Sequence, residues 1–545
     1  MAAKKQARKQ ALPTPAPKRL GPSRLLAVFF GFWVVTAGLQ VINSAWQADF
    51  GAHPDEAAHV VTGLMIRDYV AGGFLTEFHP LRYAETYYDH FPKVALGHYP
   101  PGFYLTEALF LLPYPSPAAA LLHLSAIAAG LALLTFIIGR RITGNDPLAF
   151  AAALVLLLLP VVQRYTSIIM ADLLVALLML ASAAAFARFL VTSSKRDSLL
   201  FGVLAAATIL TKGSGLLLAL LPPIAIALTG RWSLIKNPAL WLAPLPVLLL
   251  ALPWMWFTHD ISAEGMRGVP LLQHIREALA FYPAYLPRML GWGWTILLIF
   301  GILASLRLIW LARSTATTAL PATLLSLVLA LYGFHALCPI GLEDRYLLPA
   351  LAPLLLLAIM VVQAVFRLAD LPKRAAWVPA AIVLLLAVFE VIRLVPKPDR
   401  SFTALAQLVA RDIETSPAEA QPPVNVLISS DARGEGAFIA AMALVTSDRS
   451  RSPVRVLRSS QQIASSDWMG RGYTLAATNN QQVEDLLDEQ SVDLVVVDPG
   501  LQDRSRRPHH DLMVKWWSEF HQRSGTPASD AETAPVLVDR QPSSH

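Results

Sequence analysis

The stretch IIMADLLVALLMLASAAAFARFL, residues 168–190, decides the fold class of this chain. It is long enough to cross a bilayer as one helix, since a span needs roughly 20 predominantly apolar residues. Similar runs recur along the chain, which has 545 residues, 55% of them hydrophobic and only 15% charged. Soluble proteins carry about 25% charged residues. The composition therefore predicts a multi-pass membrane protein that contacts the lipid bilayer.

The apolar runs predict about eleven transmembrane helices, with the amino terminus in the cytoplasm. The long run over 198–229 is split at Lys212, because a polar, glycine-rich break suits a tight turn between helices. With this split, each cytoplasmic loop carries at least one Lys or Arg, in agreement with the positive-inside rule. The predicted spans lie near 25–43, 117–139, 147–162, 168–190, 198–211, 214–229, 239–257, 291–311, 320–338, 346–366 and 376–395.

The chain is expected to have three parts. A basic cytoplasmic tail covers residues 1–24, a transmembrane domain covers 25–396, and a soluble α/β domain outside the cytoplasm covers 397–545. In the last part, short β-rich runs alternate with helical patterns, which predicts an open and largely parallel sheet. The runs of strand length are 424–430, 454–459 and 492–498.

Two long loops, 44–116 and 258–290, are predicted to lie outside, and the first is the expected catalytic loop. Segments 56–71 and 271–281 within them have the pattern of amphipathic helices lying on the membrane. The formal charge of +6 resides largely in the tail and the short loops, so we predict no nucleic-acid partner. The sequence contains no GxxxxGK[ST] or GxSxG motif, which argues against P-loop and hydrolase chemistry.

The pair Asp55-Glu56 in GAHPDEAAH, residues 51–59, is the most informative polar feature. A carboxylate at a membrane border acts as a general base if burial lifts its pKa toward the working pH. The alternatives are a solvated loop or a helix cap. His53 and His59 add further metal-binding side chains, but their spacing matches no strong zinc pattern. We therefore assign no metal, although a divalent ion stays an open alternative.

Two ionisable residues near the membrane are further candidates. Asp172 lies in the first turns of an apolar helix, where a charge is costly and functional by default. Its alternative is a structural ion pair with a neighbouring span. Lys212 follows one apolar run and precedes another, and would bind a lipid phosphate with help from the glycine-rich turn. Its alternative is a side chain that extends to the lipid headgroups.

The segment GLEDRYLLPA, residues 341–350, joins two late spans and contains Glu343 and Arg345. The planar guanidinium of Arg345 suits bidentate binding of a phosphate. A local Glu–Arg pair is the alternative. Tyr99 begins a Tyr-Pro-Pro-Gly sequence that predicts a rigid turn beside the membrane.

These motifs, in their order, resemble the GT-C membrane glycosyltransferases. The nearer branch contains the protein O-mannosyltransferases and the aminoarabinose and galacturonic acid transferases of lipid A. The resemblance covers about residues 20–395. It rests on Asp55-Glu56, PPGFY at 100–104, Asp172, Lys212-Gly213 and RYLLP at 345–349. It implies a GT-C-like helical membrane domain, and the α/β region is placed like the periplasmic domain of the aminoarabinose transferases.

The resemblance also implies residue roles. Asp55 would be the catalytic base with Glu56 beside it, and Asp172 would support the base or position the acceptor. Lys212 and Arg345 would bind the leaving lipid phosphate. We add Arg164, on its proximity to Asp172, and Tyr99, His59 and Glu343 as further substrate-binding candidates.

The expected activity is an inverting transfer of a sugar from a polyprenyl-phosphate donor. The acceptor would be a hydroxyl of an envelope lipid, glycan or protein on the periplasmic side of the plasma membrane. Two alternatives remain, a multi-pass transporter and an envelope assembly protein without transferase activity. A transporter would show internal repeats and interrupted helices at matching positions; the sequence shows neither.

Overall fold

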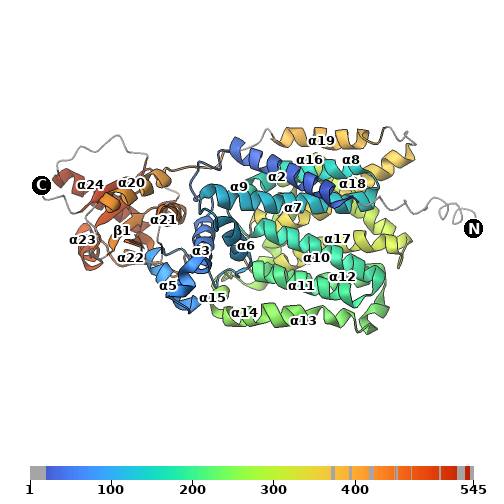
Figure 1. Ribbon diagram of the computed structural model, residues 1–545, viewed down its shortest axis with the longest axis horizontal. Helices are drawn as coiled ribbons and strands as arrows, with labels where there is room; N and C mark the ends of the chain where they lie inside the picture. Colours follow the sequence, from blue (N-terminus) through green and yellow to red (C-terminus); the bar gives the residue numbers. More distant parts are fainter. Residues whose placement is uncertain are drawn as a thin grey trace, which may run out of the picture.

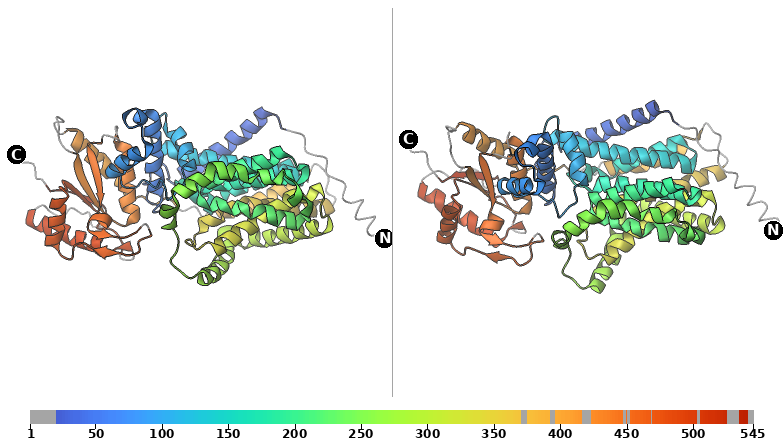
Figure 2. Two further views of the ribbon diagram at one scale, coloured as in Figure 1. Left: turned by 90° about the horizontal axis from the view of Figure 1, so that it is seen from below. Right: turned by 60° about the horizontal axis from the view of Figure 1, so that its bottom comes forward.

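The computed structural model describes residues 20–369, 375–391, 396–415, 423–446, 449, 452–467, 469–502, 505–524 and 534–540. Most of the predicted cytoplasmic tail, residues 1–19, lies outside these ranges. The molecule is elongated, with a helical bundle at one end and an α/β region at the other (Figure 1). Figure 2 shows from two further sides that the α/β region stays at the same end of the bundle.

Seven helices in the described residues are long and apolar enough to cross a membrane, or eight if one bent pair counts as a single span. Each of the eleven predicted spans falls on a helical segment, but those near 198–211, 214–229 and 376–395 are shorter than a span requires. The predicted fold class, a polytopic helical bundle followed by an α/β region, is confirmed. The bundle comprises α2 (Pro22–Ile42), α7 (Pro117–Thr143), α8 (Asp146–Leu158), α9 (Pro160–Ser167), α10 (Asp172–Thr192), α11 (Lys195–Thr211), α12 (Leu221–Thr229), α13 (Pro244–Pro246), α14 (Leu252–Phe257), α16 (Leu271–Leu311), α17 (Ala316–Leu337), α18 (Leu348–Leu368) and α19 (Val378–Val391).

Two breaks in the bundle helices redirect polar residues. Helices α8 and α9 meet at an angle of 59° beside Pro160, which cannot donate the backbone hydrogen bond that would continue α8. The bend sends α9 across the end of the bundle nearest the α/β region. Helix α16 changes direction at Gly291, whose φ of 78° favours glycine. The predicted span beginning at residue 291 is therefore the second half of a longer, broken helix.

A layer of short helices lies between the bundle and the α/β region (Figure 1). The expectation that segment 56–71 lies on the membrane surface is wrong, because α3 packs between α6 and α21, with Val60 and Leu64 fully buried. Small residues permit this packing, since a Cβ on Gly436 would lie 3.0 Å from that of Ala57. The helices of this layer are α3 (Glu56–Asp68), α4 (Phe74–Thr76), α5 (Pro80–His90), α6 (Gly102–Leu111) and α15 (His259–Ala263).

The α/β region has a four-stranded sheet in the order β2-β1-β5-β6. Strand β1 pairs in parallel with β2 and β5, as predicted, whereas β6 adds an antiparallel edge that the sequence analysis missed. A second, two-stranded sheet pairs β3 with β4. The elements are α20 (Phe402–Thr415), β1 (Val424–Ser429), α21 (Ala432–Val445), β2 (Val454–Arg458), α22 (Ser459–Gln462), β3 (Ala464–Ser465), β4 (Thr474–Leu475), α23 (Asn480–Glu489), β5 (Leu494–Val497), α24 (Pro508–Ser524) and β6 (Val536–Asp539).

Alternate residues of β1 belong to two different cores, because successive strand side chains point to opposite faces. Val426 and Ile428 pack with Phe438 of α21 in a core that continues into the membrane bundle. Leu427 packs with Trp516 of α24 in a separate, smaller core. One face of the sheet is therefore joined to the bundle through α21.

Asp49, just after α2, holds the start of the α/β region in place. Its carboxylate accepts hydrogen bonds from the backbone N–H groups of Arg400, Phe402 and Thr403, at 2.9, 3.2 and 3.1 Å. The loop over 44–116 and the α/β region are thus fixed to one another. This arrangement allows both parts to build a single site.

Candidate active site

A cavity of about 660 Å³ lies where the bundle, the loops over 44–116 and 258–290 and the α/β region meet. Five of the predicted site residues line it, and all five come from loops or helix ends on the bundle side. The α/β region supplies side chains from the ends of β1 and β2 and from the start of α24. The bundle side contributes Asp55, Tyr99, Lys212, Glu343 and Arg345 to the lining, and the α/β region contributes Arg458 and Arg507.

Asp55 stands at the start of α3, immediately after Pro54. Its Oδ2 atom accepts a hydrogen bond from the Tyr99 hydroxyl at 2.9 Å and two from the guanidinium of Arg345 at 3.3 Å. Among the described residues, Oδ1 has no protein partner. Burial alone would raise the pKa of Asp55, but Arg345 and the neighbouring histidines hold it well below its usual range. The carboxylate is therefore charged, with one oxygen free.

Arg345 lies in the first turn leading into α18 and is almost completely buried, with 4% of its side chain exposed. It donates to Glu343 Oε1 at 2.9 Å as well as to Asp55. Glu343 in turn lies 3.2 Å from Nε2 of His53. Burial raises the pKa of Glu343, but His53 and Arg345 together lower it to about 2. One guanidinium is thus shared by two carboxylates, and a third anion would have to compete with them.

Lys212 lies at the sharp turn between α11 and the following 3-10 helix, Gly213–Ala219. A Cβ at Gly215 would lie 2.6 Å from the backbone nitrogen of Ile209, so the turn requires a glycine there. The ammonium of Lys212 forms a buried ion pair with Asp172 Oδ1 at 2.6 Å. It also lies 5.0 Å from the ring centroid of Tyr346 and 5.9 Å from that of Tyr99.

Two aromatic rings connect Lys212 and Arg345 to each other and to Asp55. The Tyr99 ring contacts Lys212 while its hydroxyl bonds to Asp55. The Tyr346 ring lies 5.4 Å from the Arg345 guanidinium and also contacts Lys212. Asp55, Lys212 and Arg345, widely separated in the sequence, therefore occupy one wall of one cavity.

Two other predicted residues lie behind this wall. Asp172 contacts Lys212, and its second oxygen is buried with no hydrogen-bond partner among the described residues. The ring centroids of His59 and Tyr99 lie 4.6 Å apart, and in the described part of the chain neither buried ring nitrogen of His59 has a hydrogen-bond partner. Burial lowers the pKa of His59 to about 3, so its ring is neutral. Both residues support the cavity wall without lining the cavity.

Glu56 points away from the cavity. Its fully buried carboxylate pairs with Lys397 Nζ at 2.6 Å and accepts the N–H groups of Ala52 and Ile169 at 3.0 and 3.2 Å. It thereby joins the loop over 44–116, the segment before α10 and the linker to the α/β region. Lys397 was not a sequence candidate, because nothing in its local sequence signals a partner in the first loop.

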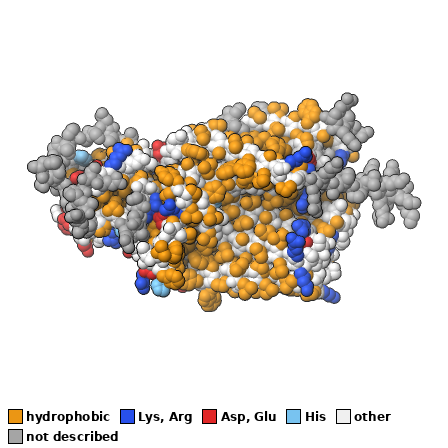
Figure 3. Space-filling view, viewed as in Figure 1, with side chains coloured by type: hydrophobic (Ala, Val, Ile, Leu, Met, Phe, Trp, Pro, Cys, Tyr) orange, Lys and Arg blue, Asp and Glu red, His pale blue; other side chains and the backbone are white. Residues whose placement is uncertain are grey.

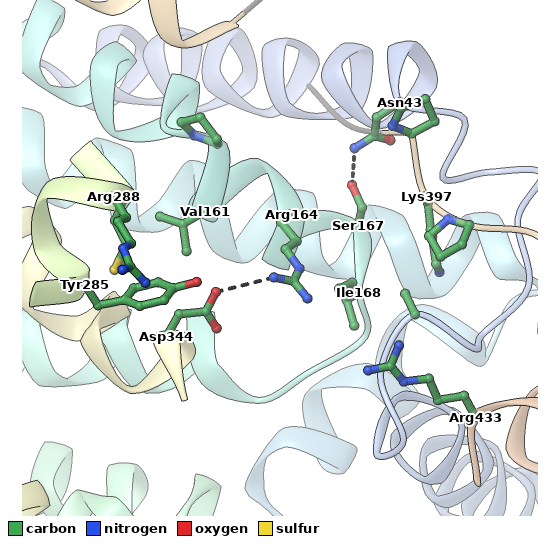
Figure 4. Close-up of a pocket in the computed structure, with 15 residues that line it drawn as sticks. Asn43, Val161, Arg164, Ser167, Ile168, Tyr285, Arg288, Asp344, Lys397 and Arg433 are labelled. Carbon is green, nitrogen blue, oxygen red and sulfur yellow. Dashed lines mark hydrogen bonds and ion pairs between the residues drawn. The ribbon is translucent and has the colours of Figure 1, made fainter. Parts of the chain in front are cut away.

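Arg164 does not pair with Asp172, the residue that suggested it. Within the described part of the chain its ion pair is with Asp344, at 3.4 Å, and Tyr165 donates to the same carboxylate at 2.7 Å. The bend beside Pro160 turns Arg164 into a second cavity of about 420 Å³ (Figure 4). Sequence patterns do not predict that the α/β region forms part of the wall of the first cavity. Arg458 and Arg507 lie in that part of the wall.

No group of three or more His, Cys, Asp and Glu side chains able to hold a metal ion occurs among the described residues. The histidines of the first loop are dispersed. His53 contacts Asp55 and Glu343, His59 is enclosed by aromatic rings, and His98 lies 3.9 Å from Glu264. The metal alternative therefore has no ligand cluster in this part of the chain.

Comparisons with known proteins agree with the geometry. Residues 57–261 match the model of the family described as dolichyl-phosphate-mannose-protein mannosyltransferase. The fold is similar to that of ArnT from Cupriavidus metallidurans bound to undecaprenyl phosphate, with 13% identity and a TM-score of 0.53, over 88% of this chain and 94% of that one. The apo state of the same protein gives 14% identity and a TM-score of 0.54, over 86% and 93%. No curated protein matches the chain. The predicted resemblance is confirmed.

Proposed function

We propose that this membrane protein is a glycosyltransferase that transfers a sugar to a hydroxyl group of an envelope lipid, glycan or protein. The family match supports a sugar donor carried on a polyprenyl phosphate. The transfer inverts the anomeric carbon. One observation carries the proposal: a charged carboxylate with a free oxygen and two buried cations share the wall of one cavity.

The reaction places different demands on the two sides of the sugar. The acceptor oxygen attacks the anomeric carbon while the bond from that carbon to the phosphate oxygen breaks. The acceptor proton passes to Oδ1 of Asp55, and the bonding electrons leave with the phosphate. Lys212 and Arg345 are positioned to stabilise the negative charge on the leaving phosphate, which lowers the barrier. A single displacement of this kind inverts the configuration.

Arg345 couples donor binding to the strength of the base. In the free protein its guanidinium bonds to Asp55 and keeps that carboxylate weakly basic. A donor phosphate that draws Arg345 toward itself weakens this pair, and burial then raises the pKa of Asp55. The base becomes effective only when the donor is bound. Tyr99 keeps Oδ2 oriented throughout.

The distribution of charge supports the proposed side of the membrane. Lys and Arg side chains gather at the end of the bundle farthest from the α/β region (Figure 3). Loops meet at that end, since Arg231 donates to the carbonyl of Thr315 and Arg367 to that of Thr143. The positive-inside rule assigns this end to the cytoplasm. The cavity and the α/β region then face the periplasm from the plasma membrane.

Mass spectrometry of envelope lipids and glycans from cells with and without the gene tests the proposal. We expect at least one component to lose the mass of one sugar when the gene is removed. The same component should stay unmodified when only Asp55→Asn is supplied. Identical profiles in all three strains would reject the transferase assignment and favour a transporter or assembly protein.

A further inference from the structure

The second cavity is separate from the cavity that contains Asp55. It lies between the end of α2, α9, the first half of α16 and the start of α21. The segment 343–346 forms the wall between the two cavities, because Arg345 faces Asp55 whereas its neighbour Asp344 faces the second cavity. The two sites therefore share a wall and lie close together.

Three arginines from separate parts of the chain converge on this second cavity. Arg164 comes from α9, Arg288 from α16 and Arg433 from α21 (Figure 4). No ion pair to Arg288 or Arg433 occurs among the described residues, and both side chains are exposed. A fourth cation, Lys397, also lines the cavity but is neutralised by Glu56.

Little negative charge opposes these arginines. Asp344 is the carboxylate that lines the cavity in the described residues, and it already pairs with Arg164 and accepts from Tyr165. Three guanidinium groups against one carboxylate leave an excess of two positive charges. Asn43 and Ser167, hydrogen-bonded to each other at 2.6 Å, add polar groups to the same wall. A preformed cavity of this kind attracts an anion with several oxygen atoms.

The residues around the cavity indicate that it lies near the lipid headgroups. Asn43 directly follows the membrane-spanning α2, and Arg288 precedes the break at Gly291 where the apolar part of α16 begins. The neighbouring Trp292 is 72% exposed, and Tyr285 lines the cavity. Tryptophan and tyrosine are enriched at membrane interfaces. A headgroup attached to acyl chains can therefore reach the arginines while its chains stay in the bilayer.

We propose that the second cavity binds the phosphate-bearing headgroup of a lipid, and that this lipid is the acceptor of the transferred sugar. Binding of the lipid stands on the geometry alone, whereas its role as acceptor rests on the proposed function. The α/β region takes part through Arg433, so it contributes to acceptor recognition. The donor phosphate stays in the first cavity, with Lys212 and Arg345.

Lipid binding is tested on the full chain in nanodiscs of phosphatidylcholine with a minor fraction of phosphatidic acid. Native mass spectrometry counts the phosphatidic acid molecules retained on the released protein. We expect the wild type to retain phosphatidic acid selectively. The triple variant Arg164→Gln, Arg288→Gln, Arg433→Gln should bind it at least about 10-fold more weakly, because it loses hydrogen bonds between charged groups, which are stronger than neutral ones. Equal retention by both proteins would overturn the proposal.

Matched variants separate the site from general charge effects. Arg141→Gln removes an exposed cation at the other end of the bundle and should leave retention unchanged. Replacing the three arginines by lysine keeps the charge and should preserve most of the binding. If the Arg141 variant lost as much lipid as the triple variant, the cavity would not be the site.

Two further readouts identify the ligand and its role. Inorganic phosphate in solution should bind far more weakly than phosphatidic acid, and equal affinity would reject the lipid in favour of a free anion. Asp55→Asn should abolish sugar transfer and keep lipid retention, so a failure of the proposed function is seen separately. Full sugar transfer by the triple glutamine variant would refute the acceptor role.

Discussion

The buried pair of Glu56 and Lys397 allows a quantitative test of how the linker holds the loop over 44–116. The two side chains are 0% and 2% exposed, and their charged atoms are 2.6 Å apart. Lys397→Met removes the cation and leaves a carboxylate enclosed in protein. Breaking a buried ion pair from one side costs about 3–5 kcal/mol, because the remaining charge has lost its partner. We expect a loss of this size in the free energy of unfolding.

Denaturant unfolding of the purified protein in detergent micelles measures this loss. Adding Glu56→Gln to Lys397→Met removes the unpaired charge while keeping an acceptor for the N–H groups of Ala52 and Ile169. The double variant should therefore recover much of the stability. Lys195→Met, at an exposed position, serves as the control and should change the stability by less than about 0.5 kcal/mol. Unchanged stability in Lys397→Met would refute the inference that the Glu56–Lys397 pair joins the linker to the loop over 44–116.

Three further predictions concern the first cavity. Arg345→Gln removes the cation that lowers the pKa of Asp55, whereas the burial that raises this pKa remains. The acid limb of the pH–rate profile should therefore move to higher pH by about one unit or more. An unmoved limb would reject the coupling between Arg345 and Asp55. Lys212→Gln should weaken donor binding measured by titration, and it leaves the Asp172 carboxylate without its ion-pair partner. Adding Asp172→Asn should restore the stability of the protein but not donor binding. Restored donor binding would contradict the role of Lys212 in binding the phosphate. Tyr99→Phe should lower the transfer rate by about 10-fold, the equivalent of one hydrogen bond to a charged group, with donor affinity unchanged in the same titration.

Much of the fold could be predicted from local sequence, because membrane spans and buried strands are marked by apolar runs. Strands β1, β2 and β5 fall where short apolar runs of strand length predict them. Edge strand β6 was missed because its pairing partner β5 lies some 40 residues away and its own run is short. Helix α3 was misplaced on the membrane surface, since its burial depends on α21, far along the chain.

The site was predictable where each residue has a local signal. A carboxylate after the first span, a lysine at a glycine-rich turn and an arginine before a late helix were each recognisable alone, and the structure brings Asp55, Lys212 and Arg345 together. Partners that depend on long-range packing were not recognisable. Lys397 reaches Glu56 across 341 positions, and Arg164 reaches Asp344 across 180.

Sugar transfer by Asp55→Asn, measured with a purified polyprenyl-phosphate donor in proteoliposomes, tests the central claim most directly. The amide preserves the shape of the side chain but cannot take the acceptor proton, and loss of a general base slows transfer by roughly 10²–10⁴-fold. We expect that loss, with donor binding and the unfolding free energy close to those of the wild type. Transfer at a rate near the wild-type value would contradict the account.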